Sequence, residues 1–334
     1  MTDEDFQRLL SAVGSLSRAQ IASLDAVVRA RLTEVAAAVA PTPVDVTATS
    51  DAARVTVGLA EIEARFSVAP RCPHCHSDRI GKWGFASGLS RYRCKPCKIT
   101  FNALTGTPLA QLRKRELWDG QAQALADGIS LRKVSARLDI TLETAFRWRH
   151  RFLKAPKMAK PKVLNGTVEA DETYFLRSAK GSRQLKRPAR TRGGKATKRG
   201  LSDEQVPVLI ARDSAKATTD HILEDRSESS IAAALGSVVA KSAILVSDGA
   251  QAYRAFANRA NIAHVALNLS AGERTYGVYH IQNVNNYDSR LKTWMRRFNG
   301  VATKYLDSYL GWHRMNDRHG HTLSAKSVFA AAYG

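Results

Sequence analysis

Apolar residues recur with helical spacing in some parts of the chain and with alternating spacing in others. Residues 1–40 repeat them every three or four positions, which predicts helices, and the Pro- and Thr-rich residues 41–51 predict a linker. Residues 71–102 hold short extended runs, whereas residues 111–154 return to helical spacing. After a Pro- and Lys-rich linker at 155–163, extended and helical patterns alternate towards the C-terminus. This alternation predicts an α/β domain.

The C-terminal half has the most regular pattern. Its extended runs are rich in Val, Ile and Ala, and the helical patterns between them have one apolar face. Farther upstream, residues 52–67 fit either a strand or a helix. The elements expected in the C-terminal half are strands at 163–175, 205–212, 217–222 and 243–247, and helices at 228–241 and 283–298.

The chain of 334 residues has a formal net charge of +21, from 51 Lys and Arg against 30 Asp and Glu. Such a surplus predicts a polyanionic partner, of which DNA and RNA are the common ones, although a basic surface also favours solubility. No apolar run approaches the roughly 18–20 residues that span a bilayer, and the acidic, polar start is not typical of a secretory signal. We therefore expect a cytoplasmic protein that does not interact with a membrane.

All four cysteines fall within a stretch of 26 residues, as two C-x2-C pairs separated by eighteen residues. In a reducing compartment such pairs predict a metal site before disulfides, and this spacing suits a tetrahedral Zn2+ with four thiolates. His74 and His76 could compete as ligands, but the two pairs suffice. With no spare acid beside it, the predicted site is closed and structural. Its ligands are Cys72, Cys75, Cys94 and Cys97.

The segment GISLRKVSARLDITLETAFRWRHRFLKA predicts two short helices joined at Asp139 and Ile140. Thr141 can cap the second helix by accepting the backbone N–H of Thr144. Basic residues crowd this second helix, where the recognition helix of a helix-turn-helix meets the major groove. Any two amphipathic helices look similar, so it is the basic charge that favours DNA. The expected DNA contacts are Arg147, Arg149 and Arg151.

Two acids stand in strand-like surroundings. In VEADETYF, alternation puts Glu169, Asp171 and Thr173 on one face of a strand. A carboxylate in a strand centre is disfavoured unless it has a function or a partner. Asp248 comes just after the apolar run 243–246 and before a helical pattern, a position that suits a ligand in an α/β sheet. A structural hydrogen bond for Asp171 and a helix N-cap for Asp248 are the alternatives.

The segment HIQNVNNYDSRLKTW adds a polar helix face. Residues three and four apart are neighbours on a helix, so Asn285, Asp288 and Lys292 can share one face. Two strand acids and such a helix predict a metal site, but an Asn stands where a third acid is expected.

Taken in order, these motifs resemble the DDE-type transposases of bacterial insertion sequences, in the ISXO-like group. The resemblance covers about residues 70 to 325, and the block from His280 onwards is its most specific part. It implies an α/β fold with a ribonuclease-H-like (retroviral-integrase-like) catalytic domain, preceded by a zinc ribbon and a helix-turn-helix. The implied regions are an N-terminal helical region and linker at 1–66, the zinc ribbon at 67–105, the helix-turn-helix at 106–155 and the catalytic domain at 160–325.

The resemblance also implies a catalytic site with two divalent cations, Mg2+ or Mn2+, bound by oxygen ligands. Some members of the group have an Asn as the third ligand and a Lys seven residues later, a pattern that Asn285 and Lys292 match. Asp171, Asp248 and Asn285 are then the metal ligands, and Lys292 is a catalytic residue that reaches a DNA phosphate. Asp288, one helical turn from Asn285, remains an alternative third ligand.

The insertion at residues 177–200 contains ten Lys and Arg and no acid. By itself it fits a disordered loop. Beside Asp171, the resemblance implies that it closes on DNA phosphates with salt-sensitive affinity. The contacts expected there are Lys186, Arg187, Arg190 and Arg192.

The function implied is that of a transposase, which cuts DNA at the ends of an insertion sequence and joins them to a target. Its expected partners are double-stranded DNA, as terminal inverted repeats and as target, and further copies of the chain in a homo-oligomer on DNA at the bacterial nucleoid. Two alternatives remain open. A domesticated relative would bind DNA without cutting it, and a structure-specific nuclease would cleave without joining.

Overall fold

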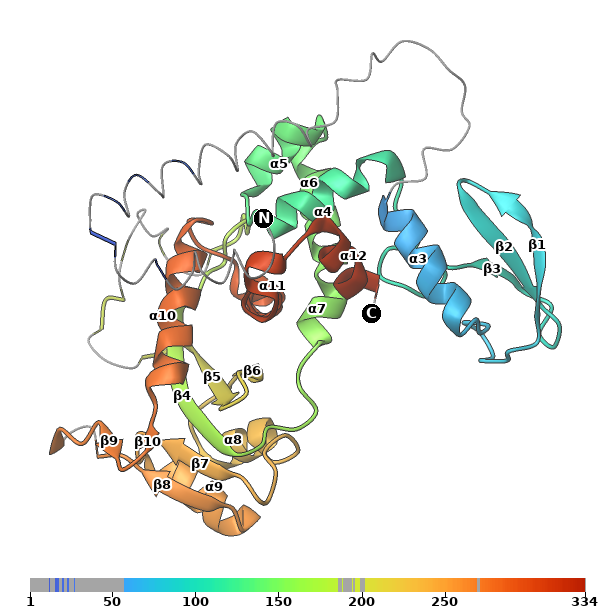
Figure 1. Ribbon diagram of the computed structural model, residues 1–334. Helices are drawn as coiled ribbons and strands as arrows, with labels where there is room; N and C mark the ends of the chain where they lie inside the picture. The colour runs from blue at the N-terminus through green and yellow to red at the C-terminus, as the bar shows by residue number, and fades with distance from the viewer. Residues whose placement is uncertain are drawn as a thin grey trace. The chain divides into compact units, whose positions relative to one another are not determined.

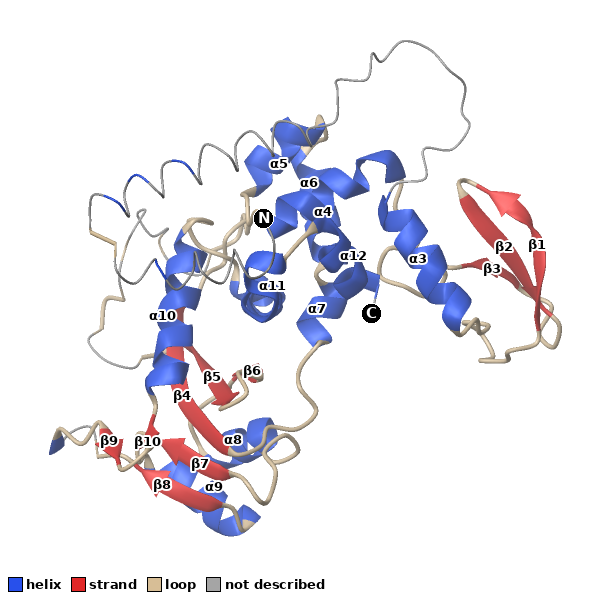
Figure 2. Ribbon diagram, viewed as in Figure 1, coloured by secondary structure: helices blue, strands red, loops and turns tan. Residues whose placement is uncertain are grey.

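The computed structural model describes most of the chain after its N-terminal region. The chain divides into two compact units, Met1–Ala52 and Ala53–Gly334. In the first unit, positions 12, 20, 23 and 27 are helical, and the rest of the predicted N-terminal helices lies outside the described residues. Figures 1 and 2 show the elements of the second unit. The described residues are 57–185, 202–268 and 271–333, with single positions at 12, 16, 17, 20, 23, 27, 188, 194 and 196–198.

The predicted zinc-ribbon region contains a small antiparallel sheet, preceded by a helix. Helix α3 (Val57–Val68) shows that the described part of the ambiguous segment 52–67 is helical. Tyr92 packs against Phe66 and Phe101, with ring centroids 5.0 and 5.8 Å apart, and few other apolar side chains are buried here. The sheet has the order β1 (Ile80–Ala86), β2 (Leu89–Cys94) and β3 (Thr100–Asn102).

Four short helices follow. The predicted cap at Thr141 is confirmed, because its Oγ1 accepts the backbone N–H of Thr144 at 3.2 Å. At the turn before it, Asp139 has a left-handed backbone with φ of 48°. The last helix runs from Lys154 into the segment 155–163 predicted as a linker, and its Pro156 is buried against the C-terminal part of the chain. The helices are α4 (Trp118–Ala126), α5 (Leu131–Leu138), α6 (Leu142–Phe152) and α7 (Lys154–Met158).

The rest of the chain forms one five-stranded sheet flanked by helices, so the fold is mixed α/β as predicted. The strand order is β6 (Thr218–Ile222), β5 (Gln205–Asp213), β4 (Thr167–Leu176), β7 (Ile244–Ser247) and β8 (Ala263–Ala266). Strands β4, β5 and β6 are antiparallel neighbours, whereas β7 and β8 run parallel to β4. The helices are α8 (Glu228–Leu235), α9 (Gln251–Ala260), α10 (Gln282–Arg296), α11 (Leu306–His319) and α12 (Ala325–Tyr333).

Alternation along β4 assigns its side chains to the two faces of the sheet, as the sequence predicts. Val168 and Ala170 belong to the apolar core that includes α8 and α9 (Figure 2). Ile210 of β5 belongs to the other core, with α10 and α11. Glu169 and Asp171 are one residue out of phase with the apolar positions, so they point to the side of α10. The sheet therefore presents acids to this helix.

The helical tail after α10 contains a deeply buried helix, α11. In α11 every residue from Ser308 to Met315 is buried. Trp312 donates its Nε1–H to the carbonyl of Leu125 in α4 at 3.0 Å, and Arg314 forms a buried ion pair with Asp220 of β6. Helix α11 thus joins the helical region to the sheet. No helix within the described residues is long and apolar enough to cross a membrane.

Candidate functional site

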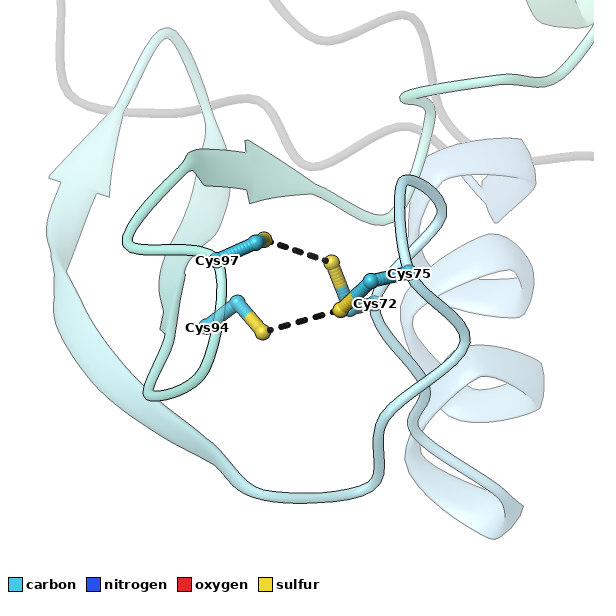
Figure 3. Close-up of side chains that lie close together, drawn as sticks. All are labelled: Cys72, Cys75, Cys94 and Cys97. Carbon is cyan, nitrogen blue, oxygen red and sulfur yellow. Dashed lines mark hydrogen bonds between the residues drawn. The ribbon is translucent and has the colours of Figure 1, made fainter.

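The four cysteines lie together in the ribbon, as their spacing predicts (Figure 3). All four sulfur atoms are within 4.8 Å of one another, with Sγ–Sγ distances of 3.6 Å for Cys72–Cys97 and 3.4 Å for Cys75–Cys94. All are free thiols, since a disulfide bond would measure about 2.05 Å. Four sulfurs around a tetrahedral zinc at ~2.3 Å are roughly 3.8 Å apart. The cluster therefore fits one Zn2+ after small adjustments.

We expect one Zn2+ per chain in purified protein, because the small ribbon core gains much of its folding free energy from the metal. Cys94 is fully buried, and Cys94→Ser is expected to release the zinc and unfold the β1–β3 sheet. Metal analysis with a thiol count checks the first point and proteolysis of the ribbon the second. His74→Ala is the control and should retain the metal. Less than about half an equivalent of zinc with intact thiols would contradict the assignment.

Asp171 lies on β4, and Asp248 comes directly after the adjacent parallel strand β7. The register of β4 and β7 pairs Val168 with Leu245 and Glu169 with Val246. Two residues farther along both strands come Asp171 and Asp248, so the same register brings the two carboxylates to neighbouring positions. The sequence predicts these positions from two separate motifs, and the sheet brings them together.

Each of these carboxylates also makes a local hydrogen bond. Asp171 Oδ1 accepts the backbone N–H of Glu172 at 2.8 Å, and Asp248 Oδ1 accepts that of Ala250 at 3.0 Å. The structural hydrogen bond raised for Asp171 is therefore present, whereas Asp248 does not cap helix α9, whose N-cap is Ala250. The two local bonds engage one oxygen of each carboxylate, which leaves the second oxygen for a ligand.

The Asp171 carboxyl lies in the field of other acids. Burial, together with the charges of Asp248, Glu172 and Asp288, raises the pKa of Asp171 to about 7, against the opposing effect of the Glu172 N–H. Half-buried carboxylates that repel one another are costly without a counter-charge. A divalent cation supplies that charge, and oxygen donors of this kind are what Mg2+ and Mn2+ prefer. The donor chemistry therefore fits the implied cations.

These acids are less tightly grouped than the cysteines. Among the described residues, the cysteines are the one set of three or more His, Cys, Asp or Glu whose ligand atoms all lie within 4.8 Å of one another. The acids around Asp171 therefore do not bring three ligand atoms within that distance of one another.

Helix α10 carries both candidates for the third ligand. Asn285 is exposed near the start of the helix. Asp288 is half-buried, its Oδ2 pairs with Lys292 Nζ at 2.8 Å, and its charge raises the pKa of Asp171. The structure thus brings Asp288 into the group with Asp171, while Asn285 lies exposed one turn earlier. Lys292, the predicted phosphate contact, is engaged by Asp288.

A family model described as the ISXO2-like transposase domain matches residues 163–312. This span runs from just before β4 into α11 and includes both strand acids and both candidates on α10. This part of the chain is similar to the ISXO2-like transposase domain. The chain is also 28% identical over 257 residues to an uncharacterized protein in transposable element ISH50 of Halobacterium salinarum, covering 75% of this chain and 86% of that protein. Both findings agree with the family expected from the sequence.

Solved complexes of Mos1 transposase are similar to the chain, but only loosely. A pre-cleavage Mos1 transpososome is 12% identical, covers 65% of this chain and 79% of its own, and has a TM-score of 0.21. A Mos1 paired-end complex with the left transposon end is 13% identical, covers 63% and 78%, and also has a TM-score of 0.21. At such TM-scores the likeness decides neither fold nor activity.

A buried carboxylate to which the sequence assigns no role ties β4 to α10. Glu169 is 4% exposed and accepts the backbone N–H groups of Asn283 at 2.8 Å and Val284 at 3.0 Å, and Asn283 Nδ2 at 2.6 Å. His280 Nδ1 lies 3.3 Å from its Oε1. Glu169 therefore satisfies N–H groups of the first turn of α10. It fixes the helix with the third-ligand candidates beside the strand with Asp171.

Glu169→Ala is expected to lower the free energy of unfolding by about 2 kcal/mol, because buried N–H groups at the start of α10 lose their acceptor. Denaturant unfolding measures the change. Glu143 is the control, since its side chain is 80% exposed and forms a surface ion pair. Glu143→Ala should change the stability by less than about 0.5 kcal/mol. Equal effects of the two changes would mean that Glu169 does not hold the helix.

The other face of β4 holds further polar groups. Burial raises the pKa of Glu172, while Tyr253 of α9 and Arg226 act to lower it. The pKa of the Tyr253 hydroxyl lies well above its usual value because of burial and the charge of Glu172. No motif marks Tyr253 or Arg226, since they approach β4 only through the packing of α9 and of the loop before α8.

Two of the arginines expected to contact DNA from α6 have partners within the protein. Arg147 is exposed and pairs with Glu143 at 2.9 Å. Arg151 donates to the backbone carbonyls of Pro108 and Ala110. Arg147 is therefore available at the surface, whereas Arg151 helps to hold the segment before α4.

Arg149 is not at the surface, contrary to the expectation from the sequence. It is 1% exposed, its Nη2 donates to the carbonyl of Ile129 at 2.6 Å, and its guanidinium lies 4.9 Å from the ring centre of Trp312. Burial lowers its pKa. Arg149 follows Ala145 by four residues, which places it on the buried face of α6. Arg149 joins α6 to α11, so its guanidinium is not available to contact DNA.

The basic insertion is described only in part. Lys186, Arg187, Arg190 and Arg192 lie outside the described residues. At the start of the insertion, Lys180 Nζ donates to the carbonyls of Phe298 at 3.1 Å and Gly300 at 2.8 Å. The insertion therefore begins beside the C-terminal end of α10.

Proposed function

We propose that the protein is a DNA transposase that binds the ends of an insertion sequence, cuts the DNA there and joins the ends to target DNA. The observation that supports this best is the pairing of Asp171 with Asp248 in a field of acids that raises the pKa of Asp171 to about 7. Strongly shifted acids are typical of functional sites. In an ISXO2-like transposase domain, they favour phosphoryl transfer over a structural role.

In this proposal Asp171, Asp248 and Asn285 hold two divalent cations, Mg2+ or Mn2+, with Asp288 as the other candidate third ligand. When bound, the cations activate the attacking water or 3′-hydroxyl and stabilise the leaving oxygen. The chain itself supplies negative charge and a rigid frame. Strands β4 and β7 fix the two acids, and Glu169 fixes α10. Preorganised charge of this kind is what phosphoryl transfer requires.

The five-stranded sheet, with Asp171 on β4 and Asp248 after β7, supports a ribonuclease-H-like catalytic domain.

The other regions are proposed to hold the DNA. Helices α5 and α6, with their short turn, support a helix-turn-helix. The net charge of +21 supports double-stranded DNA as partner. Arg147, Lys292 and the basic insertion are the proposed phosphate contacts. Because an element has two ends, we propose that the active form is a homo-oligomer on DNA.

The test is a reaction of purified protein with duplex DNA that carries the terminal inverted repeats, which are found by sequencing the DNA that flanks the gene. With Mg2+ and a target plasmid we expect nicks at the element ends and covalently joined products, and neither with a chelator. End binding without nicks would instead favour a non-catalytic DNA-binding relative, to which the Asn at position 285 points. Nicks without joined product would favour a nuclease.

A further inference from the structure

The hairpin that leads into α10 ends in two exposed apolar side chains. Strands β9 (Thr275–Tyr276) and β10 (Tyr279–His280) pair in antiparallel fashion. The turn between them is Gly277–Val278, and Gly277 has the positive φ, 59°, that a two-residue hairpin turn requires at its first position. Tyr276 is 70% exposed and Val278 is 81% exposed. The apex of the hairpin is therefore apolar and solvent-exposed.

The base of this hairpin is fixed beside the candidate site (Figure 1). Tyr279 packs against the main apolar core, and His280 Nδ1 lies 3.3 Å from Glu169 Oε1. Strand β10 also contacts β7, the strand that ends just before Asp248. The exposed tip therefore projects from a base that contacts β7 and lies beside Glu169.

The chemistry of the tip suits the bases of DNA better than other occupants. The charges of Glu273 and Arg274, just before β9, cancel. The tip therefore has no net positive charge that would attract phosphates. A second copy of the chain is a poor occupant, because two side chains present only roughly 300 Å² against the ~800 Å² per partner of a stable interface. Apolar and aromatic side chains that enter a duplex insert between base steps and unstack them.

We propose that the β9–β10 hairpin is a DNA wedge. Tyr276 and Val278 insert between bases next to the phosphodiester that lies at Asp171 and Asp248, and they unstack the duplex there. Unstacking frees the backbone to approach Asp171 on the central strand β4 and Asp248 directly after β7. This inference depends on the proposed function, because DNA lies over these acids only if they act on it.

The experiment uses the full chain and a duplex element end with 2-aminopurine beside the cut site, in Ca2+ so that binding is seen without cleavage. Wild-type protein is expected to raise the 2-aminopurine fluorescence, since the base becomes unstacked. The double variant Tyr276→Ser/Val278→Ser should bind the end with affinity within about twofold and give no rise. The control is Met158→Ser at the end of α7, because Met158 is 73% exposed and remote from the hairpin in sequence. It should behave as wild type.

A second measurement separates a wedge from a structural role. Cleavage of the matched duplex by the double variant should fall on the order of tenfold or more, and an element end with two unpaired nucleotides at the cut site should restore it. An unchanged fluorescence rise in the double variant, or an equal loss of cleavage on both substrates, would overturn the proposal. If the wild type cuts neither substrate, the proposed function fails, while the fluorescence measurement, which needs no cleavage, still decides the wedge.

Discussion

Asp171→Asn and Asp248→Asn are each expected to abolish strand transfer, by on the order of 10³-fold or more, while end binding stays near normal. Each change removes a negative charge from the proposed cation site without changing the size of the side chain. Binding should survive because we assign it to the ribbon, to α5 and α6, and to the basic insertion. Joined product per unit time at saturating Mg2+ measures the effect, and filter or gel-shift binding measures affinity.

Folding of these variants is checked by their stability without metal. Because the pKa of Asp171 is raised to about 7, the folded protein holds a proton there that the unfolded chain releases near pH 4. Stability from this group is therefore present at low pH and is lost as the pH rises through about 7. Asp171→Asn removes that loss, so its melting temperature at pH 8 should equal or exceed that of the wild type.

Asp203→Asn provides the matched control, since Asp203 is an exposed acid of the same domain. It should leave both strand transfer and binding unchanged. A rate of about one tenth of wild type or better for either Asp171→Asn or Asp248→Asn would show that this acid does not hold a metal.

Asn285→Ala is expected to slow strand transfer by on the order of 10²-fold or more, because it removes the amide oxygen that we propose as third ligand. Asn285→Glu should keep partial activity, since a carboxylate suits Mg2+ even if its longer chain fits imperfectly. Asp288→Ala should slow strand transfer less than Asn285→Ala does. It removes the partner of Lys292 and one of the charges that raise the pKa of Asp171.

Lys292→Ala is the control for Asp288, because it breaks the same ion pair from the other side. If Asp288→Ala loses activity only as far as Lys292→Ala does, Asp288 acts through the lysine. An inactive Asp288→Ala together with an active Asn285→Ala would move the third ligand by one helical turn. The site would then consist of three acids. This agrees with the contribution of the Asp288 charge to the raised pKa of Asp171.

Local patterns were sufficient for features whose parts lie close in the sequence. The doubled C-x2-C spacing predicts a cysteine cluster, and the sulfurs lie within 4.8 Å of one another. Thr141 caps α6 through Thr144, three residues away, as predicted. Alternation along β4 assigns Asp171 to the face opposite Val168 and Ala170. In each case the geometry of a turn, helix or strand fixes the relation within a few residues.

Features that depend on distant contacts were missed or misplaced. The role of Glu169 depends on Asn283, which is 114 residues away. Arg149 was expected on the surface. Helical spacing shows that it shares a face with Ala145, but only the tertiary structure shows that α11 covers that face. Its acceptor Tyr309 is 160 residues away.

The sequence by itself therefore determined the order of elements, the cysteine site and the two strand acids, because short-range periodicity fixes which side chains share a face. Only the tertiary structure decided which faces meet. The β4–β7 register brings Asp171 to Asp248, and the packing of α10 brings Asp288 into their field and leaves Asn285 exposed. The physical reason is that burial and charge–charge interaction depend on distance in space, which a helical or extended period does not encode.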